Sequence, residues 1–493
     1  MADLLPIRLW LLSPLHIGSG ADLNWLSATI DLKSGTLLRF DPTRIPAGSR
    51  LANGMQAIGK QALELPPAAN EHQVSNLIKR FQQQLKGSLS DLASAATGMS
   101  FVAPNIAEHL AQRIGLTGHA GATDQRNIIQ SLNIAEIALD VRTGRPAIPG
   151  STLKGALRTA WLDSLAQKPD HPGQGVEKGK EYEEKLLGGS FGEDPFSHVA
   201  VEDLRVPETM TSAIVAAVNV KRQPGARQGQ SVLPIQVAAA LPSLEPSCGS
   251  LRKVRRAPDE TGSSTPNLKE LLAACHSFHQ GLWAAHQPQL KQLASSWWVK
   301  AMEETLRVIA PQRGLALVRL GKFGTAEAKT TRDRSIRVKV ARDGHKSLPA
   351  GTTFWLAGDR DDRNGVPFGW AVLAWGDADP PQLPVLQAFG ETKPWSGLMK
   401  PAQRPAPSGR SASAPSAGPM SLSEGQQALE RLKMLLENRK LSGDYVKNEL
   451  KRAAEWSQED RTVLRDWVKA NLVTIEPQRF KHKPILELLG KLG

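Results

Sequence analysis

Three glycine-rich turns contain the residues of this chain that are best suited to hold an anion. They are SPLHIGSG at 13–20, IPGSTLKGALRTA at 148–160 and VRLGKFGTAEAKTT at 318–331. Backbone N–H groups at glycine turns and helix starts attract phosphate oxygens, and lysine or arginine adds positive charge. The candidate residues for phosphate contacts are His16, Gly18, Gly20, Gly150, Ser151, Lys154, Arg158, Arg319, Gly321 and Lys322.

The second of these turns opens a helix that the apolar spacing predicts over 151–165. Ser151 or Thr152 is suited to cap the N-terminus of this helix. Lys154 and Arg158 are four residues apart, so they share one face near the positive end of the helix dipole. The pattern favours a phosphate site, and it equally fits an amphipathic helix with two solvated cations.

Positive charge is also concentrated in two later segments. The sequence over 218–241 predicts a strand, a basic turn and a strand, with Lys221 and Arg222 near the tip. Within 319–346, nine Lys or Arg residues stand against three acids, which is nearly half of the net charge of the chain. A basic loop between strands suits a phosphate backbone, although the earlier hairpin also fits a solvated loop. The additional cations singled out in the later loop are Arg332, Arg334 and Arg337.

Few side chains are suited to catalysis. His16 could act as a general base, and Asp22 or Asp31 could bind a metal ion for phosphodiester cleavage. His276 and His279 have i,i+3 spacing, but no acid or cysteine stands at metal-ligand distance in the sequence, so we expect structural histidines. No nucleotide-binding or metalloprotease motif occurs. We therefore expect no cofactor and no resident metal.

Composition restricts the class of protein. The 493 residues carry a net charge of +13, and the pI is about 9.7, which favours a polyanionic partner. No apolar run is long enough to predict a transmembrane helix, and the N-terminus lacks the features of a secretory signal. The two cysteines, Cys248 and Cys275, have no CxxC partner. This pattern argues against a disulfide scaffold and favours a cytoplasmic protein without a membrane partner.

The pattern of elements predicts an α+β fold followed by an all-α tail. The predicted segments are a first module at 1–205 with a helical insertion at about 56–114, a second module at 206–395 with a helical segment at 268–310 and the basic glycine loop at 319–346, a Pro/Ala/Ser-rich linker at 396–422, and a helical appendage at 423–493. Leucines at 429, 432, 435 and 436 predict one apolar face in the appendage, and Ser457 is a predicted N-cap.

The three glycine-rich turns, in this order, resemble the RAMP proteins of type III CRISPR–Cas effector complexes. The I-P-G-S-x-L-K-G-x-L-R motif at 148–158 carries most of the resemblance, and SFGEDPFSHVAVEDLRV at 190–206 and PFGWAV at 367–372 add to it. The length and the late R-L-G-K motif most resemble the subunit that caps the type III-A (Csm) complex. The resemblance implies RRM-like, ferredoxin-like modules and binding of the CRISPR guide RNA at its 3′ end, without nuclease activity. It also implies other RAMP backbone subunits, small helical subunits, target RNA and recruited host nucleases as partners.

Two departures and three alternatives accompany this resemblance. The late loop has G-K-F-G-T in place of the fuller G-x-G-x-x-G, and the segment after 423 has no counterpart in the usual capping subunit. One alternative is a RAMP backbone subunit that cleaves target RNA with Asp22 or Asp31. The second is a metal-independent processing endoribonuclease that uses His16, and the third is a scaffold that contacts only protein.

Overall fold

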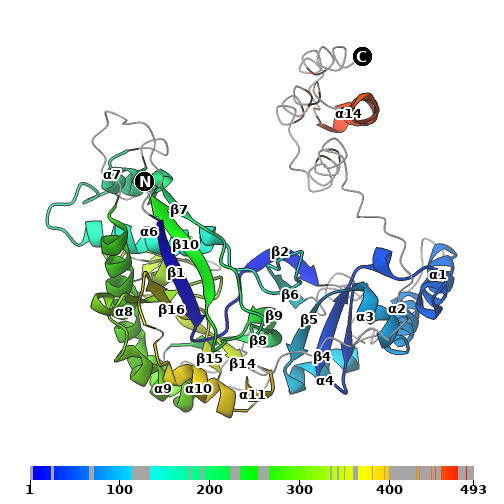
Figure 1. Cartoon of the computed structure of the whole chain (residues 1–493), viewed down its shortest axis with the longest axis horizontal. Coiled ribbons are helices and arrows are strands. Elements are labelled where there is room, and N and C mark those ends of the chain that lie inside the picture. The colour runs from blue at the N-terminus through cyan, green and yellow to red at the C-terminus, as the bar shows by residue number, and fades with distance from the viewer. Residues whose placement is uncertain are drawn as a thin grey trace. The chain divides into compact units, whose positions relative to one another are not determined.

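The computed structural model shows two compact units, Met1–Ser408 and Gly409–Gly493 (Figure 1). The residues that the structure describes in the first unit are 4–23, 27–65, 71–113, 134–176, 179–189, 194–222, 234–253, 266–333, 336–340, 344–348, 350–358, 365–379, 381–393 and 395–398. In the second unit they are 429, 432, 446, 450, 453, 457–475 and 485. The predicted linker at 396–422 lies outside the described residues from 399 onward.

The first sheet has five antiparallel strands, and two long helices pack against it. In spatial order its strands are β11 (Leu315–Arg319), β16 (Trp370–Trp375), β1 (Leu4–Leu11), β10 (Ser247–Lys253) and β7 (Val199–Val201). Helices α6 (Gly150–Ala166) and α8 (Leu268–Leu293) pack against each other and against strands of this sheet (Figure 1). Without β11, the order β16-β1-β10-β7 is that of a β-α-β-β-α-β module whose helices are α6 and α8.

The second sheet has nine strands and combines parallel and antiparallel pairs. Its strands are β2 (Gly18–Leu23), β6 (Ile134–Ile137), β9 (Ile235–Ala240), β8 (Ser212–Lys221), β5 (Ala96–Val102), β4 (Thr36–Phe40) and β3 (Ala28–Asp31), with β14 (Thr353–Gly358) beside β8 and β15 (Val366–Pro367) beside β14. β8 and β9 pair antiparallel, as the sequence over 218–241 predicts. The turn between them lies outside the described residues.

Shorter elements surround the two sheets. They are η1 (Pro42–Arg44), α1 (Arg50–Leu63), α2 (Glu71–Lys86), α3 (Leu89–Ala95), α4 (Pro104–Arg113), α7 (Gly179–Leu187), η2 (Pro195–His198), α9 (Ser296–Leu306), η3 (Pro311–Arg313), η4 (Ala326–Lys329), the hairpin β12 (Ile336–Val340) and β13 (Gly344–Leu348), α10 (Pro384–Glu391) and α11 (Trp395–Leu398). The predicted helical insertion at about 56–114 contains, besides its helices, the strand β5 (Ala96–Val102). That segment pairs with β4 and β8, which supplies hydrogen bonds that its local sequence does not reveal.

The strand pairing confirms the α+β class and corrects the predicted division at residue 205. β1 pairs with β16, so the start of the chain lies beside residues 370–375, and both sheets take strands from both sides of the predicted boundary. Successive side chains of β1 point to opposite faces of the sheet. Leu9 joins the core that includes α6, whereas Trp10 joins the core that includes α9. Because both faces are buried, β1 is apolar at successive positions and does not show the alternation of a half-exposed strand.

The second unit has a small apolar core of its own. Leu429, Leu432, Leu464 and Val468 are among its buried residues. Its described helix, α14 (Gln458–Ile475), begins after Ser457, whose Oγ accepts a hydrogen bond from the Asp460 N–H at 3.2 Å, so the predicted N-cap is confirmed. The predicted Leu435 and Leu436 lie outside the described residues.

Removal of the second unit should leave the first unit folded. The described core residues of the second unit pack among themselves, and the two sheets are built entirely from residues before 376. We therefore expect a chain that ends at Ser408 to melt within about 2 °C of the main transition of the full chain, because no described core contact of the sheets is lost. Calorimetry of both chains tests this, and an insoluble truncated chain would show that the tail belongs to the main core.

Two further features of the sequence, the cysteines and the lack of long apolar runs, can be followed in the structure. Cys248 and Cys275 are free, and Cys275 is buried. Among the described residues, no helix has the length and apolar character needed to cross a membrane.

Candidate functional site

The three glycine-rich turns predicted from the sequence meet at one cleft of about 600 Å³. One wall comes from β2, a second from α6, and the third from the loop and η4 that follow β11. The residues that line the cleft are Ile17, Gly18, Gly20, Ser151, Thr152, Gly155, Ala156, Thr159, Arg319, Leu320, Gly321, Lys322, Gly324, Ala328 and Lys329. The fold thus brings together turns that are separated by more than 100 residues in the sequence.

Backbone contacts fix the loop after β11 against the segment after β1. Gly321 has a φ of +85°, and a Cβ at this position would lie 2.6 Å from the carbonyl oxygen of His16. The N–H of Lys322 donates to that same oxygen at 3.0 Å. The N–H of Leu320 donates to the carbonyl of Gly369 at 2.8 Å. Only glycine accommodates both the positive φ and the close approach at 321, so the loop has a defined course along the cleft.

The helix α6 presents small residues to the cleft. Gly155 is exposed, and a Cβ built there would meet no atom within 4 Å. Glycine in a helix interior is destabilising relative to alanine. Packing within the described part of the chain does not require Gly155. Its position in the cleft wall indicates that it leaves space for a ligand.

The start of α6 differs from the predicted side-chain cap. The N-cap is Pro149, without a side-chain hydrogen bond, and the N–H of Gly150 donates to Asp203 Oδ1 at 2.7 Å. A Cβ at Gly150 would lie 2.1 Å from the carbonyl oxygen of Val201. The prediction that Ser151 or Thr152 caps the helix was therefore wrong. Gly150 permits close packing on β7 and does not line the cleft.

Arg319 is the most unusual residue of the cleft. Its side chain is 3% exposed, its Nε donates to the Phe368 carbonyl at 3.2 Å, and its guanidinium carbon lies 5.0 Å from the centre of the Trp370 ring. Neither Nη1 nor Nη2 has a hydrogen-bond partner among the described residues. Burial lowers the pKa of Arg319 to about 9, so the group remains charged near neutral pH. A buried charge with unsatisfied donors is costly, which points to an anionic ligand.

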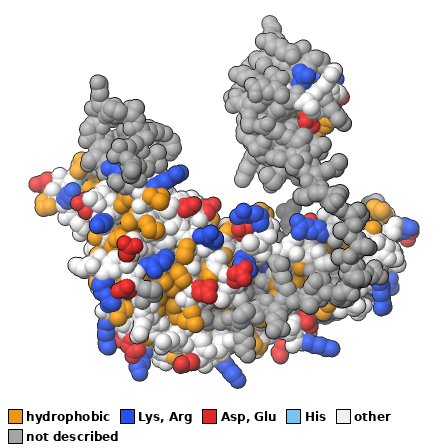
Figure 2. All heavy atoms as spheres, viewed as in Figure 1, with side chains coloured by type: hydrophobic (Ala, Val, Ile, Leu, Met, Phe, Trp, Pro, Cys, Tyr) orange, Lys and Arg blue, Asp and Glu red, His pale blue; other side chains and the backbone are white. Residues whose placement is uncertain are grey.

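Two further cations accompany Arg319. Lys322 and Lys329 line the cleft, and no carboxylate belongs to the described residues that line it. On the face shown in Figure 2, by contrast, basic and acidic side chains are intermixed. The cleft therefore combines glycine, hydroxyl groups and unpaired positive charge, which together favour binding of phosphate groups.

Two predicted phosphate-binding arginines are instead held by acids within the protein. Arg158 forms ion pairs with Glu183 at 2.6 Å and with Asp194 at 3.3 Å. Arg332 donates from its backbone N–H to Asp163 Oδ1 at 2.7 Å and from its Nε to Oδ2 at 2.9 Å. Neither arginine lines the cleft. Both predictions require correction, because carboxylates distant in the sequence already neutralise these cations.

The other predicted basic residues differ in their burial and pairing. Arg222 is buried and paired with Glu327, whereas Lys221 is exposed at the end of β8. Lys154 does not line the cleft, and burial lowers the pKa of its amine. Arg334 and the side chain of Arg337 lie outside the described residues.

His16 is a buried structural neighbour of the cleft. Its Nδ1 lies 2.7 Å from the carbonyl oxygen of Ala238, so Nδ1 donates and Nε2 is the basic nitrogen. Nε2 is buried and has no partner among the described residues, and a Cβ at Gly18 would lie 3.2 Å from it. Burial lowers the pKa of His16, which keeps the ring neutral. The geometry therefore supports a structural role for His16, which shapes the turn at Gly18.

The candidate metal ligands do not form a site. Asp31 accepts hydrogen bonds from the Lys33 N–H at 3.0 Å and from Ser34 Oγ at 2.7 Å, as in a tight turn. Neither Asp22 nor Asp31 lines the cleft. His279 is buried, and its pKa falls to about 3 through burial. Within the described ranges, no group of three or more His, Cys, Asp or Glu residues could hold a metal ion.

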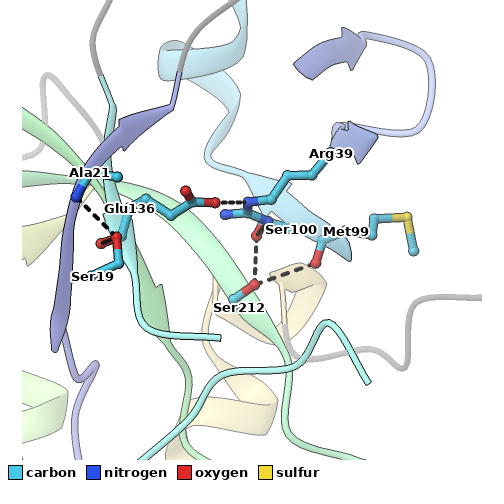
Figure 3. A network of polar contacts seen from close by, with 7 residues as sticks. All are labelled: Ser19, Ala21, Arg39, Met99, Ser100, Glu136 and Ser212. Carbon is cyan, nitrogen blue, oxygen red and sulfur yellow. Dashed lines mark hydrogen bonds and ion pairs between the residues drawn. The ribbon is translucent and has the colours of Figure 1, made fainter. Parts of the chain in front are cut away.

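A buried polar network behind β2 was missed by the sequence analysis. Arg39 donates from Nε to Glu136 Oε1 at 2.8 Å and from Nη1 to Ser100 Oγ at 2.8 Å (Figure 3). Ser100 and Ser212 are joined at 2.5 Å, and Ser19 Oγ donates to the Glu136 carbonyl at 3.3 Å. The network links β4, β5, β6 and β8 to the strand that carries Gly18 and Gly20. The only signal in the sequence was an arginine within the apolar strand TLLRF.

Comparison with known proteins gives a family-model match within the first unit. Residues 8–219 match the RAMP superfamily model, a range that includes β2 and α6. No curated protein matches the sequence. A chain of a type III-A Csm-crRNA-target RNA ternary complex has a TM-score of 0.38 and 17% identity, covering 75% of this chain and 100% of that chain. T. onnurineus Csm5 has a TM-score of 0.42 and 16% identity, covering 74% of this chain and 99% of that chain.

Proposed function

We propose that this chain, whose residues 8–219 match the RAMP superfamily model, is a non-catalytic subunit that binds CRISPR guide RNA in the cleft between β2, α6 and the loop after β11. The observation that carries the proposal is Arg319, a buried guanidinium with two unpartnered nitrogens at a cleft walled by glycines. Phosphate contacts of this kind position a nucleic acid without reading its sequence. We therefore expect little dependence of affinity on the RNA sequence.

The proposed place of the chain is at the 3′ end of the guide in a type III-A effector complex, where it would cap the filament and support guide maturation. This part of the proposal rests on the motifs at 13–20, 148–160 and 318–331. Its partners would be RAMP backbone subunits, small helical subunits, target RNA and recruited host nucleases. The second unit would serve as a docking module, because a tethered module raises the local concentration of the partner that it binds.

The binding role is supported by the chemistry of the cleft wall, which offers cations and hydroxyl groups. A nuclease that uses Asp22 or Asp31 would have its acid outside the cleft, and His16 does not line the cleft either. Incubation of the pure protein with RNA, with and without Mg²⁺, distinguishes these roles. Cleavage that disappears in D22A, D31A or H16A would overturn the non-catalytic assignment.

The salt dependence of RNA binding tests the cleft directly. We expect K322Q and K329Q each to lower the magnitude of the slope of log K against log salt by about 0.7, because each removes about one phosphate contact to a single strand. Fluorescence anisotropy with a labelled single-stranded RNA at several salt concentrations measures this slope.

Two control variants accompany the salt measurement. K300Q removes an exposed cation of α9, and R158Q removes a cation already paired with Glu183 and Asp194. Both should leave the slope unchanged. Equal effects of K300Q and K322Q would show that binding depends on net charge and not on the cleft.

A further inference from the structure

Asp163 of α6 is a buried carboxylate that binds one residue of a distant segment at three points. Its side chain is 1% exposed. Its Oδ1 accepts a hydrogen bond from the backbone N–H of Arg332 at 2.7 Å, and its Oδ2 accepts from Arg332 Nε at 2.9 Å and from Nη2 at 2.5 Å. Because Asp163 binds both the main chain and the side chain of Arg332, it fixes the course of the backbone there as well as pairing the charge.

The two partners continue two walls of the cleft. Asp163 follows Thr159, which lines the cleft, by four residues, so both lie on one face of α6. Arg332 follows Lys329, which lines the cleft from η4, by three residues. The helix α6 and η4 also contact each other. The pair of Asp163 and Arg332 therefore ties η4 to α6 without itself lining the cleft.

Two further helices hold the chain directly after η4. Tyr182 of α7 donates from its hydroxyl group to Asp333 Oδ2 at 2.6 Å. Gly281 of α8 lies against the guanidinium of Arg332, because a Cβ at this glycine would lie 3.2 Å from Arg332 Nη1. The end of the loop that carries η4 is thus held by α6, α7 and α8, and Asp163 supplies the anchor on the helix that forms a wall of the cleft.

We propose that Asp163 is a positioning residue for RNA binding, which acts through Arg332 to hold η4 where the amine of Lys329 reaches a phosphate. This inference rests on the proposed function, because it concerns how the same cleft keeps its walls in place. Lys322 does not depend on this anchor, since its own N–H donates to the carbonyl of His16 at 3.0 Å. The two lysines of the cleft should therefore respond differently when Asp163 is changed.

The sign of the effect separates positioning from simple electrostatics. An acid near a bound polyanion weakens binding through its charge, so removal of the charge alone should make D163A bind RNA more tightly than the wild type. Lost positioning should do the opposite. We expect D163A to bind a labelled single-stranded RNA about fivefold more weakly, and to lower the magnitude of the salt slope by about 0.7 as K329Q does, because one phosphate contact is lost.

Double variants of the full chain locate the effect at Lys329. In a K329Q background, D163A should change the affinity less than about twofold, because the contact that it disturbs is already absent. In a K322Q background, D163A should still weaken binding about fivefold. D163N keeps the size of the side chain and an oxygen that can accept from the Arg332 N–H, so it serves if D163A does not fold. It should lose about threefold in affinity with the same dependence on background.

Other roles of Asp163 give different results. Tighter binding by D163A, or equal losses in the K329Q and K322Q backgrounds, would overturn the inference. V385A, which truncates a buried residue of α10, controls for lost stability and should keep wild-type affinity. Failure of the wild-type chain to bind RNA would overturn the proposed function. Normal binding by D163A and D163N, with a reduced salt slope for K329Q, would overturn this inference alone.

Discussion

R319Q is expected to lower the affinity for single-stranded RNA about ten- to hundredfold without lowering the melting temperature of the free protein. A hydrogen bond between charged partners contributes about 1.5–3 kcal/mol, which corresponds to this loss. In the free protein, however, the buried guanidinium has two unsatisfied nitrogens. Its replacement by a neutral side chain removes a buried charge that the described residues compensate with one hydrogen bond, from Nε to the Phe368 carbonyl.

The prediction is specific because it combines a loss of RNA affinity with no loss of thermal stability in the free protein. If Arg319 served only to stack on Trp370 and to bond the Phe368 carbonyl, R319Q would lower stability and leave RNA affinity nearly unchanged. Thermal denaturation of the free protein and RNA titration of the same preparation measure both quantities. K300Q provides a charge-matched control on the exposed face of α9.

The sequence located the cleft because glycine-rich turns are local signals. Positions such as Gly321 show in the sequence that the backbone must turn sharply, and the structure gives the reason in a φ of +85°. Arg319 was also identified in advance, but as an ordinary cation. Its burial depends on packing against Trp370, which is 51 positions away and lies on a neighbouring strand.

The errors arose where a charge is neutralised by a distant residue. Arg158 and Arg332 look like available cations in the sequence, but their partners Glu183 and Asp163 are far along the chain. The same limit applies to the fold. The composition of β1 predicts a buried strand, but only tertiary packing places it between β10 and β16. A window of local sequence carries no information about such pairings.

The Pro inside α8 shows the converse case, in which tertiary packing overrides a local signal. Pro288 lies within a helix that continues from Leu268 to Leu293. Proline removes one backbone hydrogen bond from a helix interior and costs about 3 kcal/mol. Burial of Leu282, Trp283 and Leu290 on the same helix offsets that cost. The sequence over 268–310 predicted helical structure, and the break falls at Ser295 and not at the proline.

G155L is expected to raise the stability of the free protein and to reduce RNA affinity more than tenfold. Glycine in a helix costs about 0.5–1 kcal/mol relative to alanine or leucine, and a Cβ at this position would meet no atom within 4 Å. The new side chain would therefore extend into the cleft. There it would occupy the space between α6 and the loop that carries Arg319 and Lys322.

Gly59 supplies a matched control for this variant. It is also an exposed glycine inside a helix, α1, and a Cβ there meets nothing within 4 Å, but it does not line the cleft. G59L should raise stability by a similar amount and leave RNA affinity unchanged. G155A should give most of the gain in stability with a smaller loss of affinity, because its methyl group fills less of the cleft. If G155L and G59L bound RNA equally well, the wall formed by α6 would not face the RNA, and the binding surface would have to lie elsewhere on the chain.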